Sequence, residues 1–412
     1  MFCGSCMHDN ALAKALIALG HDAVLVPCYT PIRVDEADAS INRVFLGGVN
    51  LYLDHRWPWT RRLPRFVKAG LNSRVVLRQL SRFSSRSDAK ELGDMTIAML
   101  RGEDGALATE LPPLIDFIAG DLRPDAVLFS NALMAGVLPS LRRRYDGPVA
   151  CLLQGDDVFL DGLSDRDRRA AVSLMASEPL RFDRYLSHTH FYADHMAGYL
   201  GLPRVAMSVV PLGIDADAFP VGPHRPEGRT VGYFARLAPE KGLHNLVDAF
   251  LQIADRGVRL RIGGFVHGKD RAYADRQFGR LAGTDWEYAG SPATHAEKVA
   301  FHHSADVFSV PTEFLEPKGL PVLEAMACGR PVVQPAHGSF PEIVEATGGG
   351  RLVPPGDADA LAETLLALLD DADARRSLGE AAARGVRERH GLTANAAGTA
   401  DVLASLAAAP AA

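Results

Sequence analysis

Short apolar runs alternate with longer stretches of helical periodicity through the first 210 residues of the chain. Strands that are separated by helical crossovers predict a parallel sheet with helices on both of its faces. The predicted strands are residues 23–26, 126–130, 149–153, 185–187 and 206–210, and the predicted helices are residues 10–19, 131–143, 166–176 and 191–200.

The same rhythm resumes after a segment rich in helix breakers. Residues 211–221 read PLGIDADAFPV and are followed by the polar run HRPEGR, which indicates a hinge between two domains. We therefore predict a first domain over residues 1–212, a hinge over 213–228, a second domain over 229–390, and a last helix and tail over 391–412. The second-domain strands are predicted at 230–234, 258–262, 286–289, 306–310 and 331–333, and the helices at 241–250, 319–327, 360–369, 372–389 and 393–407.

Composition supports this division and excludes several classes of protein. A chain of 412 residues with 47% hydrophobic residues can bury two cores, and its net charge of −6 argues against general nucleic-acid binding. Five scattered cysteines suit a reducing compartment rather than a disulfide scaffold. No apolar stretch reaches the length of a membrane span, and no signal pattern opens the chain, so we expect a cytoplasmic protein.

The stretch from Ser309 to Val333 carries the strongest chemical signal. An apolar strand leads into a loop and then a helix that starts near Gly319, with Glu316 in the loop and Glu324 in the second turn of the helix. A helix N-terminus offers free backbone N–H groups to a phosphate, and carboxylates can accept hydrogen bonds from sugar hydroxyls. Two acids near a helix start can also be mere partners of the helix dipole. The strand–loop–helix context favours a ligand loop at the carboxyl end of a strand.

The segment from Glu313 to Val333 resembles the donor-binding motif of the retaining glycosyltransferases of family 4, which have the GT-B architecture. Further segments that are similar to those of this family are residues 209–219, 232–250 and 341–371. The resemblance implies an α/β fold of two Rossmann-like, doubly wound domains that face a central cleft, with the last helix crossing back to the first domain.

The resemblance also assigns roles to residues of this chain. Arg236 and Lys241 would stabilise the departing diphosphate, and Glu316 would lie at the sugar ring. Glu324 would bind the ribose hydroxyls. Further donor contacts are expected from the backbone N–H groups of the α-helix that starts near Gly319 and from two positions of the first domain. These donor-binding residues are Gly319, Leu320, Val322, Gly4 and Gln154.

The beginning of the chain departs from the family pattern. A doubly wound domain normally starts with a strand and a glycine turn, but this sequence enters a helix almost at once. By spacing, Gly4 takes the place of the second loop glycine and Cys3 that of the first. The first strand is missing, and we expect that the true start lies upstream. Cys3 and Cys6 are interpreted as small residues of a tight loop rather than as a redox or zinc pair.

Two features of the first domain bear on chemistry and on partners. Gln154 stands where the family commonly has a histidine that approaches the donor sugar, and an amide cannot exchange a proton near neutral pH. Residues 56–90 hold ten basic residues and one acidic residue. This segment fits either a solvated helix face or peripheral contact with an anionic membrane that carries a lipid-linked acceptor.

These observations favour a retaining, metal-independent hexosyltransferase that uses a nucleotide-diphosphate sugar and no further cofactor. Its acceptor would be a glycan, a lipid-linked sugar or a small molecule in polysaccharide or glycolipid biosynthesis. The alternatives are a non-catalytic scaffold or binding subunit with this fold, and a sugar-nucleotide epimerase. A glycoside hydrolase is disfavoured, because Glu316 and Glu324 lie on one side rather than flanking a bond.

Overall fold

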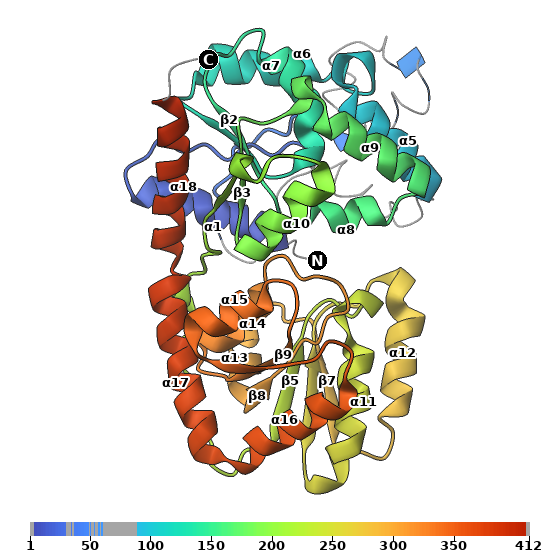
Figure 1. Cartoon of the computed structure of the whole chain (residues 1–412), viewed down its shortest axis with the longest axis vertical. Coiled ribbons are helices and arrows are strands. Elements are labelled where there is room, and N and C mark those ends of the chain that lie inside the picture. The colour runs from blue at the N-terminus through green and yellow to red at the C-terminus, as the bar shows by residue number, and fades with distance from the viewer. Residues whose placement is uncertain are drawn as a thin grey trace. The chain divides into compact units, whose positions relative to one another are not determined.

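The chain folds into two compact units in this computed structural model (Figure 1). The structure describes residues 4–29, 34, 37–48, 50, 53, 57, 59–60 and 89–408. One unit, called here the N-terminal unit, contains Ser5–Val210 and the chain from Ala396 on, and the C-terminal unit contains Pro211–Asn395. Most of the basic segment, residues 56–90, lies outside the described residues.

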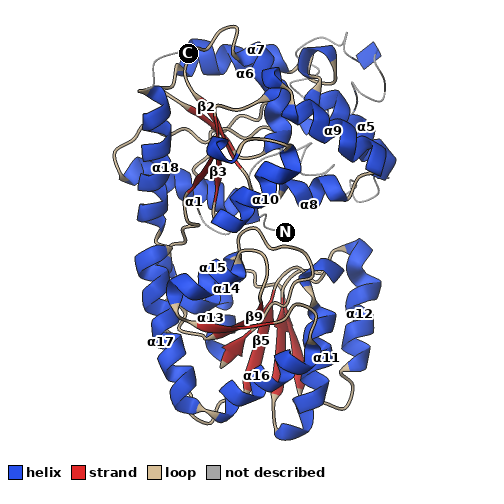
Figure 2. Cartoon of the chain, in the orientation of Figure 1, coloured by secondary structure: helices blue, strands red, loops and turns tan. Residues whose placement is uncertain are grey.

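The N-terminal unit is built on a parallel sheet with the strand order β1-β2-β3-β4. Helices pack on both faces of this sheet (Figure 2), as the alternation of apolar runs and helical stretches predicted. Its strands are β1 (Val127–Phe129), β2 (Val149–Leu152), β3 (Arg184–Ser187) and β4 (Met207–Val209). Its α-helices are α1 (Gly4–Ala18), α5 (Ala89–Leu100), α6 (Leu111–Ile115), α7 (Leu138–Leu141), α8 (Asp156–Asp161), α9 (Asp165–Ala176) and α10 (His190–Leu200).

Three predictions for the N-terminal unit are wrong. Helix α1 begins at Gly4 rather than near residue 10, so Gly4 is helical and does not lie in a glycine turn. Residues 23–26 form only an isolated bridge between Leu25 and Ser40, because Pro27 has no N–H with which to extend the ladder. The helix predicted over 131–143 is a 3₁₀ helix over Ala132–Val137 followed by the short α7, since Pro139 cannot donate a helical hydrogen bond.

The C-terminal unit contains a parallel sheet with the strand order β10-β9-β8-β5-β6-β7. The chain builds β5, β6 and β7 in one direction and then returns to place β8 on the other side of β5. The topological switch point therefore lies between β5 and β8, which is where ligands bind in open α/β sheets. The strands are β5 (Thr230–Phe234), β6 (Arg259–Gly263), β7 (Trp286–Gly290), β8 (Val307–Phe308), β9 (Val332–Pro335) and β10 (Gly350–Val353).

Helices cover both faces of this second sheet (Figure 2). The strands and helices predicted after residue 229 are all present within a few residues, whereas α12, α13 and α15 have no counterpart among the predicted helices. The α-helices of this unit are α11 (Leu243–Ile253), α12 (Arg271–Arg280), α13 (His295–Ser304), α14 (Leu320–Ala327), α15 (Phe340–Thr347), α16 (Ala358–Asp370) and α17 (Ala372–Arg389), and α18 (Leu392–Ala407) follows them in the chain. Gly329 follows α14 with φ +75°, the left-handed conformation expected of a glycine that ends a helix.

The last helix, α18, belongs mainly to the N-terminal unit. Its side chains Val402, Leu403 and Leu406 pack against a small buried cluster on β2, β3 and the residue after β4. This contact confirms that the last helix returns to the first domain. Separate larger clusters form the cores of the two units, as the apolar content of the sequence led us to expect.

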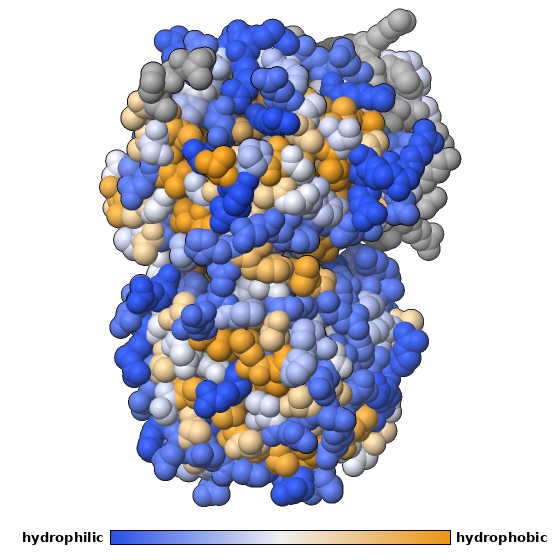
Figure 3. All heavy atoms as spheres, viewed as in Figure 1, coloured by the Kyte–Doolittle hydropathy of each residue, from blue (hydrophilic) through white to orange (hydrophobic). Residues whose placement is uncertain are grey.

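Hydrophilic residues cover much of the visible surface, with smaller groups of apolar residues exposed between them (Figure 3). Trp57 and Trp59, near the start of the basic segment, are among the exposed large side chains. None of the helices in the described part of the chain combines the length and the apolar run that a bilayer crossing requires.

Candidate functional site

Two loops meet at the switch point of the C-terminal sheet. The loop after β5 carries Lys241, and the loop after β8 carries Glu316. Buried Tyr233 on β5 donates a hydrogen bond to the backbone oxygen of Lys241 at 3.2 Å, and the Glu313 N–H donates to the Glu240 carbonyl at 3.1 Å. The first contact holds the loop after β5 on its own strand, and the second joins the two loops at the carboxyl ends of adjacent strands.

Lys241 and Glu316 form an ion pair in which the carboxylate is buried and the lysine is half-buried. The Lys241 Nζ lies 2.8 Å from the Glu316 Oε2, and the Glu316 residue is 7% exposed. Burial by itself raises the pKa of Glu316, but the charge and hydrogen bond of Lys241 outweigh it and hold that pKa below its ordinary value. The ammonium also lies 4.4 Å from the centre of the Phe314 ring. The structure thus brings together two of the predicted site residues, and their roles stay predictions.

Glu316 also organises the start of α14. Its Oε1 accepts hydrogen bonds from the N–H groups of Lys318 at 3.3 Å and Gly319 at 3.1 Å. Gly319 has φ +70° and is the N-cap of α14, so the first-turn residues Leu320 and Val322 follow directly. The N–H of Val322 donates to the Gly319 carbonyl at 3.0 Å. Two of the three N–H groups predicted to hold phosphate are thus already engaged within the loop and the helix.

The loop after β9 supports Glu316 from a third side. The Ser339 N–H donates to the Glu316 carbonyl at 2.8 Å. Gly338 has φ +61°, and a Cβ there would lie 2.6 Å from the Glu316 nitrogen, so this close approach requires glycine. Sequence reasoning did not identify Gly338, since a single glycine among helix and strand signals gives no local hint of this contact.

Arg236 lies on the same loop as Lys241, but its side chain is more exposed to solvent than that of Lys241. Its guanidinium forms an ion pair with Glu240, four residues on, and its side chain is 38% exposed. Within the described part of the chain, its ion-pair partner is therefore neither Glu316 nor Glu324. Its position at the end of β5 leaves it able to exchange Glu240 for an anionic ligand.

Glu324 is buried in the second turn of α14 and is paired with residues that sequence reasoning missed. The Lys298 Nζ on α13 lies 3.1 Å from the Glu324 Oε1, and the His302 Nε2 lies 3.7 Å from the Oε2. Burial raises the pKa of Glu324, but Lys298 and His302 more than offset this, so its pKa lies below the ordinary value. The signal available in the sequence was the i, i+4 spacing of Lys298 and His302, which places both on one helix face.

In the N-terminal unit, Gln154 follows β2 and contacts the first helix. Its amide Nε2 donates to the Asp9 Oδ1 at 2.8 Å and lies 3.4 Å from the carbonyl oxygen of Ser130, after β1. Gly4 is exposed at the first turn of α1. The carboxyl-end loops of β1 and β2 therefore converge on α1 near Gln154, and the structure adds Asp9 to the residues predicted there.

Asp157, in the first turn of α8, accepts two hydrogen bonds from α10. The Tyr192 hydroxyl donates to its Oδ1 at 2.6 Å, and the His195 Nε2 lies 3.1 Å from its Oδ2. Burial raises the pKa of Asp157, but His195 and Tyr192 lower it overall, and the hydrogen bond to Asp157 raises the pKa of His195. His188 is buried and contacts the Val210 carbonyl instead, at 3.1 Å. Within the described residues, no three histidine, cysteine, aspartate or glutamate side chains are placed to hold a metal ion.

The His195–Asp157 pair predicts a pH-dependent contribution to stability. Because the folded state raises the pKa of His195 above 6.5, its contribution is complete below about pH 6.5 and is lost as the pH rises through the folded pKa. We expect His195→Asn to lower the unfolding free energy more at pH 5.5 than at pH 9. Urea unfolding of both proteins at the two pH values measures this, and equal losses would contradict the pairing.

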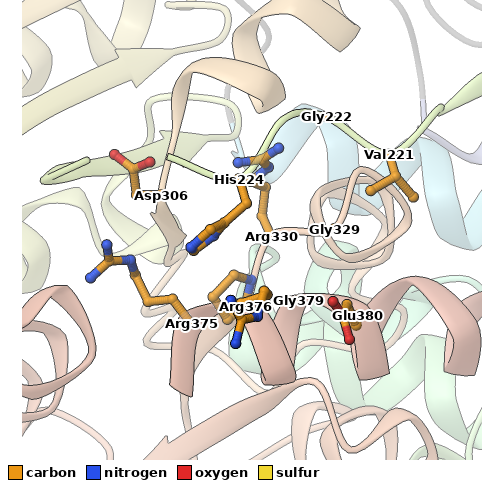
Figure 4. Close-up of a pocket in the computed structure, with 11 residues that line it drawn as sticks. Val221, Gly222, His224, Asp306, Gly329, Arg330, Arg375, Arg376, Gly379 and Glu380 are labelled. Atoms are coloured by element: carbon orange, nitrogen blue, oxygen red, sulfur yellow. The ribbon is translucent and has the colours of Figure 1, made fainter. Parts of the chain in front are cut away.

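A separate cavity of about 150 Å³ lies at the amino ends of β8 and β9, away from the loops at the switch point (Figure 4). Buried Arg330 donates to the carbonyl oxygens of Cys328, Ala305 and Pro223. Buried Arg375 donates to four carbonyl oxygens, those of Leu368, Leu369, Arg225 and Pro226. The two guanidinium groups thus tie residues 223–226 to the C-terminal unit, and we assign the cavity a structural role.

We expect Arg375→Met to lower the free energy of unfolding by about 3 kcal/mol, because four carbonyl oxygens, two of them in buried contacts, lose their charged donor. The neighbouring Arg376 on α17 is exposed and forms an ion pair with Asp373, three residues before it on the same helix. Arg376→Met therefore serves as the control, with a change within about 0.5 kcal/mol. Equal effects of the two substitutions in urea unfolding would refute the role of Arg375.

Comparison with known proteins places these observations in context. Residues 216–385 match the family model of glycosyl transferases group 1. The MMP alpha-(1→4)-mannosyltransferase of Mycolicibacterium hassiacum is 31% identical over 176 residues, which are 42% of each chain. The chain spans about half the length of the first curated relatives that it matches.

Solved structures share the fold over a larger part of the chain. A glycosyltransferase from Rickettsia africae has a TM-score of 0.67 at 14% identity and covers 97% of this chain and 94% of its own. Anabaena HepE, solved in complex with UDP and glucose, has a TM-score of 0.61 at 20% identity and covers 76% of this chain and 96% of its own. These likenesses confirm the predicted GT-B fold class.

Proposed function

We propose that this chain, whose residues 216–385 match glycosyl transferases group 1, transfers a sugar from a nucleoside-diphosphate sugar to an acceptor hydroxyl with retention of anomeric configuration. The observation that carries the proposal is the Lys241–Glu316 pair at the switch point, with Glu324 on the adjoining helix α14. The solved complex of HepE with UDP and glucose supports a nucleotide-sugar donor. Retention is proposed on the resemblance of the Glu316–Glu324 segment to the donor motif of retaining enzymes.

The reaction breaks the bond between the anomeric carbon and the diphosphate oxygen, and the electron pair leaves with the diphosphate. The acceptor oxygen forms the new bond to the anomeric carbon, and its proton passes to the leaving diphosphate. Lys241 and Arg236 would neutralise the negative charge that grows on the leaving group, which is the largest electrostatic demand of the step. No metal ion is invoked, because these two cations supply the charge.

Glu316 would accept hydrogen bonds from sugar hydroxyls and stabilise the positive charge that develops on the sugar ring. Its carboxylate is already fixed in direction by Lys241 and by the Gly319 N–H. Such preorganisation costs no rearrangement when the transition state forms. Glu324 would bind the ribose hydroxyls, and the N-terminus of α14, with Gly319, Leu320 and Val322, would lie near the diphosphate. Gln154 of the N-terminal unit would contact the donor sugar through its amide, and Gly4, in the first turn of α1, would make a further donor contact.

The acceptor is proposed to be a sugar hydroxyl on a glycan or on a lipid-linked sugar. A lipid-linked acceptor would bring the protein to the inner face of a membrane, where the basic residues 56–90 could contact anionic lipid. This contact stays a prediction from sequence, as does the cytoplasmic location.

The proposal is tested by incubating the protein with UDP-, GDP- and ADP-sugars and following melting temperature and nucleotide release. A specific rise in melting temperature with one base, and release of that diphosphate when acceptor is added, would support transfer. Glu316→Gln should abolish release, EDTA should not change it, and NMR of the product should show the anomeric configuration of the donor. Binding without turnover would favour a scaffold, and an altered donor sugar without transfer would favour an epimerase.

A further inference from the structure

Lys298 is a buried cation that sequence reasoning did not connect with the donor site. It lies on α13, and its side chain is 7% exposed. Its Nζ lies 3.1 Å from the Glu324 Oε1 and 5.5 Å from the centre of the Phe219 ring. The ammonium of Lys298 therefore lies near an aromatic ring and against the carboxylate of Glu324 on α14.

The second neighbour of Glu324 does not supply positive charge. His302 is fully buried, and desolvation, which outweighs the nearby carboxylate, lowers its pKa, so its ring is neutral near pH 7. The distance of 3.7 Å between its Nε2 and the Glu324 Oε2 exceeds a hydrogen bond. Among the described residues, Lys298 is therefore the cation that balances Glu324, and it does so at one carboxylate oxygen.

We propose that Lys298 is a positioning residue that holds Glu324 as an oriented carboxylate whose remaining lone pairs accept hydrogen bonds from the ribose 2′- and 3′-hydroxyls. Lys298 thereby gives the donor site its preference for ribonucleotides over deoxyribonucleotides. This inference rests on the proposed function, because it names what the Glu324 end of that site recognises.

A purely structural role explains the pair less well. A buried ion pair often contributes no more to stability than apolar side chains of similar volume would, because both charges lose their hydration. A cation that holds one carboxylate oxygen, however, fixes the orientation of the carboxylate, so its remaining lone pairs point in set directions for hydrogen bonds. A charged acceptor also binds hydroxyls more strongly than a neutral one. Glu324 lies in the second turn of α14, on the same helix as Leu320 and Val322, which are proposed to lie near the diphosphate.

The inference is tested by calorimetric titration of the full chain with the pairs UDP and dUDP, GDP and dGDP, and ADP and dADP. The wild type should bind one ribonucleotide about 10 to 100 times more tightly than its 2′-deoxy analogue, as expected for a hydrogen bond to a charged group. In Lys298→Met the preference should fall below about threefold, mainly through weaker binding of the ribonucleotide. Arg330→Met, which also removes a buried cation from this unit but not from Glu324, should keep the wild-type preference.

Lys298→Met leaves the buried Glu324 charge without its cation, which could impair folding. The double variant Lys298→Met with Glu324→Gln removes both charges and therefore serves as the control for this effect. If Lys298 acts through Glu324, this double variant and Glu324→Gln alone will show the same reduced preference. A wild-type preference that survives in both Lys298→Met and the double variant would overturn the inference while leaving the proposed function intact. If the wild type binds none of the six nucleotides, the proposed function itself fails, and the inference falls with it.

Discussion

Replacing Lys241 with methionine is expected to slow sugar transfer by a factor of about 10² to 10³, which is the usual cost of removing one preorganised group that stabilises transition-state charge. Lys241 lies at the switch point, and its ammonium is held 2.8 Å from Glu316. Its loss removes positive charge from the leaving group and also leaves Glu316 buried without a counter-ion. The measurement is kcat and KM for nucleotide release, with kcat carrying most of the loss.

A matched control for Lys241 is Arg256, at the other end of α11. Arg256 is exposed and follows α11, whereas Lys241 immediately precedes the glycine that caps that helix. Arg256→Met removes the same charge from the same unit and should leave kcat within about twofold of the wild type, as is usual for exposed substitutions. If Lys241→Met were as active as Arg256→Met, a direct role of Lys241 in the chemistry would be excluded.

Much of the fold could be predicted because both sheets are parallel and buried on both faces. Strands such as β2 and β9 are short apolar runs, so their positions follow from the sequence pattern alone. Strand order could not be predicted in this way, because the placement of β8 beside β5 depends on packing between distant segments. Helix α12 was missed because its sequence, RAYADRQFGR, carries few apolar residues to mark a buried face.

At the candidate site, too, the features set by neighbouring residues could be predicted, whereas the contacts between distant segments could not. The strand–loop–helix unit around Glu316 and Glu324 and the left-handed glycines at 319 and 329 follow from local sequence. The pairing of Lys241 with Glu316 joins residues 75 positions apart, and only family resemblance anticipated that they act together. Lys298 reaches Glu324 across 26 positions without any motif, which is why the structure was needed to find it.

Gly242 allows the two loops that carry Lys241 and Glu316 to approach each other, and we expect the stability of the C-terminal unit to depend on it. Gly242 has φ +69°, and a Cβ at this position would lie 1.7 Å from the Pro311 carbonyl oxygen. The obstacle is backbone at the end of β8, so no side-chain rotation can relieve it. The glycine therefore permits the loop after β5 to approach the loop after β8 closely enough for Lys241 to reach Glu316.

We accordingly expect Gly242→Ala to lower the free energy of unfolding by about 3 kcal/mol or more, through a left-handed alanine and a backbone collision together. Gly257, just beyond the other end of α11, has φ +71°, but a Cβ there would meet nothing within 4 Å, so Gly257→Ala should cost only about 1 kcal/mol. Both variants carry the cost of a left-handed alanine, whereas only Gly242→Ala adds the backbone collision. The difference between their unfolding free energies in urea therefore measures the cost of the collision. Equal losses would mean that the loops can separate without cost, and nucleotide release by Gly242→Ala at the wild-type rate would show that the pairing of Lys241 with Glu316 survives such a separation.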